Sequence, residues 1–240
     1  MGKIIVFTGP VGAGKSFCSR LAASRINDQG LDAYYVRFRL ITLKSFFEKK
    51  RKIRKVNVKY DKPENEHPEP MNRDRFANFR LRSHWQFPVF AMVYLLRSYL
   101  FFLLIKLRYA NDIVLTDRFI HDHLTHYPLH ESNYYWMYRL IFKFAPKTDL
   151  VLILNSSTEV LMAARPRHSQ KYLDIVSRNY HALADIFPGT ILVENDSVFA
   201  KADAALGAVD KLLSNSGMVE AAAIEAPVYF ANYLKSKTEI

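Results

Sequence analysis

The sequence contains a single cysteine, Cys18, among 240 residues. One thiol excludes an intramolecular disulfide, and no signal-peptide pattern precedes the first apolar run, so we expect a reducing, cytoplasmic setting. The chain also lacks the Asn-Lys-x-Asp sequence, and the Asp-x-x-Gly sequence after a strand, that guanine-nucleotide switches use. These absences argue against a disulfide-stapled secreted protein and against a GTP-dependent switch.

Acidic residues are few relative to basic ones. The chain has 34 Lys and Arg residues against 23 Asp and Glu, which gives a formal net charge of +11 at pH 7. This excess favours polyanionic ligands or anionic membrane surfaces, although a protein that handles several phosphates needs cations as well. Much of the excess lies between residues 44 and 59, a run compatible with a solvated face or with a phosphate-rich or membrane-surface contact.

Glycine is scarce too, yet three of the eight glycines fall within residues 9–16, which read Gly-Pro-Val-Gly-Ala-Gly-Lys-Ser. We call this segment the glycine-rich turn. It follows the apolar run Ile4–Phe7 and matches G-x-x-x-x-G-K-S, the pattern of a phosphate-binding loop between a buried strand and a helix. Backbone N–H groups and the helix dipole favour an anion at such a turn.

The turn predicts a nucleoside triphosphate ligand, with ATP and Mg²⁺ as cofactors. Lys15 would reach the β- and γ-phosphates, and the Ser16 hydroxyl would hold Mg²⁺. The nucleotide-binding residues that we expect are Gly9, Gly12, Ala13, Gly14, Lys15, Ser16 and Phe17.

Apolar strand-like runs alternate with helical segments, which is typical of parallel βαβ units. We expect strands at residues 3–8, 33–38, 112–116, 149–154 and 190–194. We expect helices at residues 14–29, 85–109, 131–144, 157–164, 169–186 and 198–214. The pattern predicts an α/β fold, a three-layer sandwich of the P-loop NTPase type around a five-stranded parallel sheet, with ligands at the carboxyl ends of the strands. This P-loop domain would span residues 1–213, with an insertion at about 41–75 and a C-terminal extension at 214–240.

A pair of charged residues follows the apolar part of the third expected strand. In the segment Ile113–Phe119 these are Asp117 and Arg118. In a sheet with a phosphate-binding loop this strand lies beside the first. Asp117 would hold Mg²⁺, partly through water, or take the acceptor's proton, and Arg118 would steady a phosphate. A plain strand-end salt bridge is the alternative.

Arginines also follow the fourth expected strand and its short helix, in Ala164–His168. Arg165 and Arg167 would form a lid that closes over a triphosphate, excludes water and neutralises charge during transfer. Exposed loop arginines without such a role are the alternative.

Histidines gather just after Arg118. The side chains that zinc could recruit there are His121, Asp122, His123, His126 and His130. Their spacing matches no established zinc pattern, so we expect a polar acceptor-site loop in which Asp122 or His123 contacts a sugar or phosphate.

The nineteen residues Phe87–Ile105 carry one charge, Arg97, and approach the length of a bilayer span. The run falls between two strands that must pair on one side of any membrane, which argues against spanning. We expect instead a helix over about 88–107, buried against the sheet and then against a partner subunit in a homodimer. Peripheral contact with the inner face of a membrane and packing within one chain are the alternatives.

Taken together, these residues resemble the thymidylate kinase family and, more distantly, other P-loop nucleoside and nucleoside-monophosphate kinases. The matches are, in order, the glycine-rich turn, Val36-Arg37-Phe38, Thr116-Asp117-Arg118-Phe119 and Arg165-Pro166-Arg167. They cover roughly residues 1–213. The resemblance implies that Arg37 binds the acceptor phosphate, that Arg97 matches a family arginine at the acceptor base and phosphate, and that the protein dimerises.

The chain departs from the family pattern in the acceptor half. Val11 stands where an acidic residue is usual, and residues 120–128 read Ile-His-Asp-His-Leu-Thr-His-Tyr-Pro in place of small hydroxyl residues followed by Tyr-Gln. The expected function is transfer of phosphate from ATP to a nucleoside monophosphate or a related small-molecule acceptor, with no nucleic-acid partner. The alternatives are a membrane-associated kinase of a saccharide or lipid-linked acceptor, and a non-catalytic ATP-binding module that contacts nucleic acid.

Overall fold

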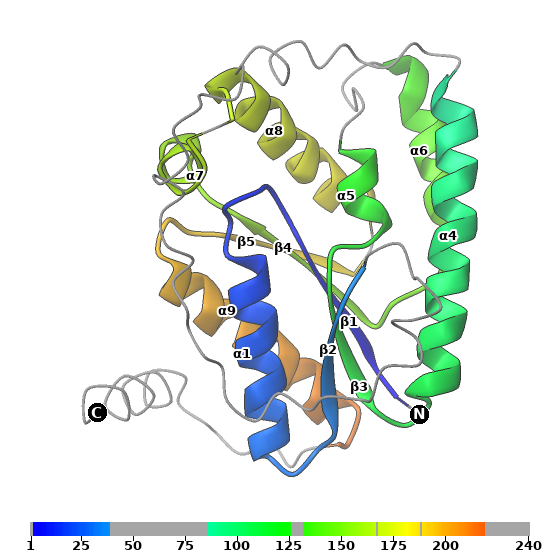
Figure 1. Ribbon diagram of the computed structural model, residues 1–240, viewed down its shortest axis with the longest axis vertical. Coiled ribbons are helices and arrows are strands. Elements are labelled where there is room, and N and C mark those ends of the chain that lie inside the picture. Colours follow the sequence, from blue (N-terminus) through cyan, green and yellow to red (C-terminus); the bar gives the residue numbers. More distant parts are fainter. Residues whose placement is uncertain (1, 39–85, 126–131, 167, 188, 219–240) are drawn as a thin grey trace, which may run out of the picture.

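The computed structural model describes residues 2–38, 86–125, 132–166, 168–187 and 189–218 (Figure 1). The strands within these ranges are β1 (Ile4–Thr8), β2 (Ala33–Arg37), β3 (Ile113–Asp117), β4 (Leu150–Asn155) and β5 (Thr190–Glu194). The helices are α1 (Lys15–Asp28), α4 (Gln86–Arg108), α5 (Ile120–Leu124), α6 (Ser132–Phe144), α7 (Thr158–Ala164), α8 (Gln170–Ile186) and α9 (Val198–Asn215). The insertion expected at 41–75 and nearly all of the extension at 214–240 lie outside the described residues.

Every strand and helix expected from the sequence is confirmed, with ends that differ by one residue at most. The helix α5 was not expected, and it replaces the start of the predicted acceptor-site loop. Five residues are too few for the 3.6-residue periodicity that identifies a helix in a sequence. The capping contact of Asp122 with the backbone N–H of Phe119 holds its first turn instead.

The five strands form one all-parallel sheet in the order β2-β3-β1-β4-β5. Helices α1 and α9 pack together and against the strands, and α8 contacts β4 and β5. In Figure 1, α1 and α9 lie on one side of the sheet and α4, α6 and α8 on the other, consistent with a three-layer α/β sandwich. All carboxyl ends of a parallel sheet share one edge, so the residues that follow β1, β2 and β3 come together.

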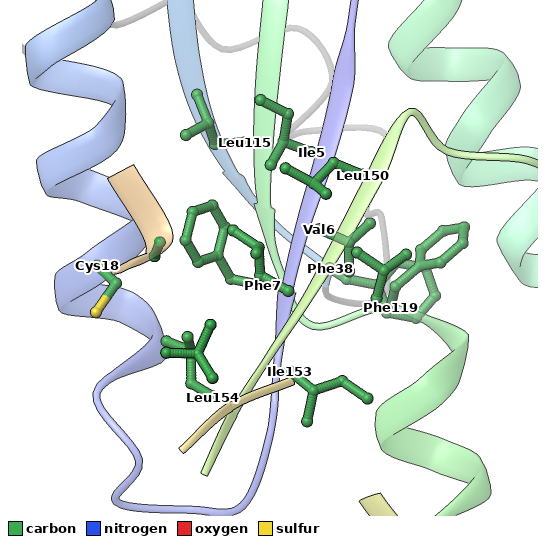
Figure 2. Packing of buried hydrophobic residues seen from close by; sticks show 14 of the residues in the cluster. Ile5, Val6, Phe7, Cys18, Phe38, Leu115, Phe119, Leu150, Ile153 and Leu154 are labelled. Atoms are coloured by element: carbon green, nitrogen blue, oxygen red, sulfur yellow. The ribbon is translucent and has the colours of Figure 1, made fainter. Parts of the chain in front are cut away.

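Helices cover both faces of the sheet. The sequences of the strands are therefore nearly continuous apolar runs, because side chains on both faces are buried. Strand β1 is buried along its whole length. Figure 2 shows Phe7 and Leu154 on the side of the strands nearer Cys18 of α1, with Ile153 and Phe119 on the opposite side. Burial raises the pKa of the Cys18 thiol to about 12, so this residue packs as a small apolar group.

Helix α4 buries only one of its faces. Ala91, Phe101 and Ile105 are buried. The opposite face exposes eight large apolar side chains: Val89, Met92, Val93, Leu96, Tyr99, Leu100, Leu103 and Leu107. Packing among the described residues therefore leaves this face uncovered, and its burial against a partner subunit, a membrane surface or another part of the chain stays a prediction. No helix among the described residues combines the length and the apolar character that a membrane crossing requires.

Candidate functional site

The glycine-rich turn depends on the conformational freedom of its glycines. Gly9, Gly12 and Gly14 have φ values of 142°, 94° and 87°, in the region that other residues rarely adopt. At Gly9 an added Cβ would lie 2.0 Å from the carbonyl oxygen of Leu154, so a side chain is excluded on space as well. The spacing of glycines in the sequence is thus explained by the backbone path that brings β1 into α1.

The turn presents a set of free backbone donors. Within the described residues, the N–H groups of Gly12, Gly14, Lys15 and Ser16 make no hydrogen bond to another backbone group. The last two belong to the first turn of α1, where no intrahelical acceptor exists. Together with the positive end of the helix dipole, these donors form a cradle suited to an anion.

Lys15 lies buried across this turn, with 6% of its side chain exposed. Its Nζ donates hydrogen bonds to the carbonyl oxygens of Gly9, at 2.8 Å, and Pro10, at 2.7 Å. Loss of solvent lowers the pKa of Lys15 from 10.5 to about 8. Charged groups close enough to act on it are Asp122 and Asp117, which raise its pKa, and Arg118 and Arg37, which lower it. Lys15 is therefore a cation at neutral pH, with its charge poorly solvated.

Asp117 ends β3 beside the turn and is almost completely buried. Its Oδ2 accepts a 2.5 Å hydrogen bond from Ser16 Oγ and a 3.0 Å bond from the hydroxyl of Tyr35. Its Oδ1 is buried and has no hydrogen-bond partner within the described residues. A buried carboxylate oxygen left without a donor fits a site for a cation or its hydration shell.

Two arginines flank this carboxylate. Arg37 pairs with Asp117 in the β2–β3 register and is exposed at the strand end. Arg118 adopts a left-handed backbone conformation, φ 74°, while its N–H bonds to the carbonyl oxygen of Phe7. A non-glycine residue in this region is strained, and such strain gathers at functional sites. In the described part of the chain no ion pair joins Asp117 and Arg118, so the strand-end salt bridge is not found.

Asp122, for which we expect an acceptor contact, is bound by donors of the protein itself. Oδ2 accepts hydrogen bonds from Thr8 Oγ1, at 2.7 Å, and from the N–H of Phe119, at 3.2 Å. Its Oδ1 accepts a 2.9 Å bond from the hydroxyl of Tyr180. The buried carboxylate thus links β1, α5 and α8, and protein donors occupy both of its oxygens.

The predicted zinc alternative finds no support in the described residues. His121 is buried among the rings of Phe119, Phe142 and Phe187, and burial lowers its pKa to about 4, so it is a neutral core residue. No group of three or more potential ligands occurs in the part of the chain that the structure describes. The side chains of His123, His126 and His130 lie outside it.

The remaining predicted arginines lie at the borders of the site. A Cβ added to Gly12 would lie 3.2 Å from the Cβ of Ala164 and 3.5 Å from the Cγ of Arg165, so the end of α7 touches the turn. The guanidinium of Arg97 lies 5.3 Å from the centroid of the Phe38 ring, just past the end of β2. Arg167 lies outside the described residues.

Comparison with known proteins adds no relative: no protein-family model and no curated protein matches the chain. The residues themselves therefore carry the functional argument. Sequence reasoning missed Tyr35, Thr8 and Tyr180. Of these, only Tyr35 had a detectable signal, because it stands two residues before Arg37 and so shares its face of the strand.

Proposed function

We propose that the protein is a cytoplasmic, ATP- and Mg²⁺-dependent phosphotransferase with a P-loop fold, related to the thymidylate kinases. One observation carries this proposal: the donor cradle of the glycine-rich turn, the buried Lys15 and the Ser16–Asp117 pair meet at one edge of the sheet. An anion site, a poorly solvated cation and a carboxylate oxygen without a donor together fit a metal-bound polyphosphate. The strand order, with β1 between β3 and β4, agrees with this fold type.

In the proposed reaction the chain's own groups position phosphates and balance charge. The N–H groups of the turn and the ammonium of Lys15 bind the triphosphate, and Ser16 Oγ with the Oδ1 of Asp117 would hold Mg²⁺, partly through water. When bound, Mg²⁺ neutralises charge that builds on the phosphate oxygens. Transfer of the γ-phosphoryl group needs little covalent chemistry from the protein, so alignment and preorganised charge supply most of the catalysis.

The acceptor side rests on Arg37, Arg118 and Arg97. The first two lie near Lys15, since both lower its pKa. Guanidinium groups bind phosphate through paired N–H donors, which suits an acceptor that already carries a phosphate, such as a nucleoside monophosphate. Arg165 beside Gly12, with Arg167 in the same segment, would complete the charge around the transferred group.

Labelled ATP and the purified protein test this proposal directly. Nucleoside monophosphates, nucleosides, saccharides and a lipid-linked acceptor are offered in turn with Mg²⁺, and each product is identified. We expect phosphate on a nucleoside monophosphate. Labelling of a saccharide or lipid would promote the alternative acceptor, and ATP binding without transfer to any of them would favour a non-catalytic module.

For the exposed face of α4 we propose a second copy of the chain as its partner. The eight apolar side chains form a stripe along one side of the helix, and Trp136, Leu140 and Phe144 of the adjacent α6 are exposed as well. Tyr99 joins the two helices through a hydrogen bond to the carbonyl oxygen of Phe144. A continuous apolar patch of this kind marks an interface.

A membrane-associated kinase is the second candidate, favoured by the charge of the same two helices. The sequences of α4 and α6 contain no acidic residue. Their basic residues are Lys106, Arg108, Arg139 and Lys143, besides Arg97, whose guanidinium lies against Phe38 at the border of the site. Apolar side chains beside cations suit the surface of an anionic bilayer, where a lipid-linked acceptor would be found.

A further inference from the structure

Tyr35 lies in the middle of β2 and is half-buried. Its hydroxyl donates the 3.0 Å hydrogen bond to Oδ2 of Asp117 on the neighbouring strand. In the β2–β3 register Tyr35 pairs with Leu115, and Arg37 pairs with Asp117. The tyrosine side chain therefore reaches two pairs further along the sheet to meet the carboxylate, whereas Ser16 meets it from the first turn of α1.

The two oxygens of Asp117 are unequal because of these contacts. Oδ2 accepts from both Ser16 and Tyr35, while Oδ1 is buried without a donor in the described residues. With its partners in place, Oδ2 has little capacity left for a further ligand. Oδ1 is the oxygen that remains available, and a carboxylate held at one oxygen by two hydroxyls cannot rotate freely about its last bond.

The tyrosine contact does not depend on a bound nucleotide. Pairing with β3 holds its backbone, and the guanidinium of Arg20 lies 5.2 Å from the centroid of its ring. A phenol carries a proton to donate at neutral pH and the carboxylate oxygen accepts it, so the direction of this hydrogen bond is fixed. Ser16, by contrast, is expected to share its oxygen with the metal ion.

From this geometry we infer that Tyr35 is a positioning residue of the metal site, whose hydroxyl fixes Oδ2 of Asp117 and thereby presents Oδ1 to Mg²⁺ or its hydration shell. The inference deepens the proposed function and rests on it, since it needs a metal-bound nucleotide at this edge of the sheet. Loss of a group that orients a metal-binding carboxylate commonly weakens the binding of the metal about 10- to 100-fold. Tyr35 touches neither metal nor substrate in this account.

The test measures Mn²⁺ binding without turnover. Mn²⁺ replaces Mg²⁺, ADP is added, and the free ion is followed by electron paramagnetic resonance in wild type and in Tyr35→Phe. We expect the Mn²⁺ dissociation constant of Tyr35→Phe to rise about 10-fold. Metal-free ADP binding should be unchanged, because the hydroxyl donates its hydrogen bond to Asp117 and phenylalanine leaves the backbone of the turn as it is. Tyr34→Phe removes a hydroxyl from the adjacent residue, which packs against Tyr109, and should leave Mn²⁺ binding as in wild type.

The outcomes separate this inference from the proposed function. If wild type binds Mn²⁺ in an ADP-dependent way and Tyr35→Phe binds it equally well, the role of Tyr35 is wrong while the proposed function stands. If both tyrosine variants weaken binding alike, the effect is a general one on β2, and the role of Tyr35 is again wrong. If wild type shows no ADP-dependent Mn²⁺ binding, the proposed function fails and this inference with it.

Discussion

The hydroxyl of Ser16, in the first turn of α1, donates a 2.5 Å hydrogen bond to Oδ2 of Asp117, the last residue of β3. The two residues are 101 positions apart in the sequence. Their contact arises because β1 and β3 are neighbours in a parallel sheet, which brings the start of the helix after one strand to the end of the other. This hydroxyl and this carboxylate lie beside the N–H cradle of the glycine-rich turn, and the proposed phosphoryl transfer depends on these parts.

Replacing Lys15 by alanine should abolish transfer while the protein stays folded. The variant removes the one buried ammonium of the turn, and loss of a preorganised charged donor lowers kcat by at least about 100-fold. Turnover is measured with labelled ATP, and folding by circular dichroism. Lys211→Ala, on the exposed surface of α9, is the matched control and should behave as wild type. Wild-type turnover by Lys15→Ala would rule out its assignment.

The dependence of kcat/KM for ATP on pH should show a falling limb near pH 8. In the free protein Lys15 has its pKa lowered to about 8, so raising the pH through that value removes the cation that binds phosphate. The limb should move to higher pH in the kcat profile, because bound triphosphate favours the charged form. Rates measured from pH 6 to 10 check this. A kcat/KM profile that is flat through pH 8 would contradict it.

Asp122→Asn should destabilise the fold more than it changes acceptor binding. Three protein donors point at this buried carboxylate, and an amide in its place turns its own N–H groups toward at least one of them. We expect a loss of about 2 kcal/mol in the free energy of unfolding, measured with urea. Asp185→Asn, at an exposed position of α8, serves as control. An unchanged stability together with a large rise in acceptor KM would restore the original expectation that Asp122 binds the acceptor.

Leu96→Glu combined with Leu103→Glu should convert a dimer into a monomer. Both leucines are exposed by more than half on the apolar face of α4, 70% and 54%, so charges there would be buried without partners in a dimer. Light scattering coupled to gel filtration gives the mass, and Ile191→Glu on β5 is the control.

The wild-type mass decides between the two partners proposed for this face. A monomer that co-sediments with vesicles of anionic lipid, and loses this binding in the double variant, would favour the membrane surface. A wild-type monomer that binds no vesicles would contradict both.

The order of elements could be read from the sequence because each has a local cause. Continuous apolar runs predict strands covered on both faces, and glycines mark places where the backbone needs positive φ, as at Gly9 and Gly14. Helix α5 was not predicted, because a helix of little more than one turn is too short to show a periodic pattern of apolar residues in the sequence. Its first turn depends on Asp122 bonding back to Phe119 and on donors from β1 and α8.

The candidate site was predictable only in part. The glycine-rich turn, Asp117 and Arg37 carried recognisable signals, since each ends a strand at the same edge of the sheet. Tyr35 is 82 residues from Asp117 in the sequence, and Tyr180 is 58 residues from Asp122. No local sequence pattern therefore predicts either contact.

Sequence alone thus determined the strands, the long helices and the glycine-rich turn, because propensity and steric limits act between near neighbours. Tertiary structure decided which carboxylate keeps one oxygen without a donor from the described residues, Asp117, and which has both oxygens occupied, Asp122. The two look alike in the chain, five residues apart, and differ only in the donors that distant strands and helices bring to them.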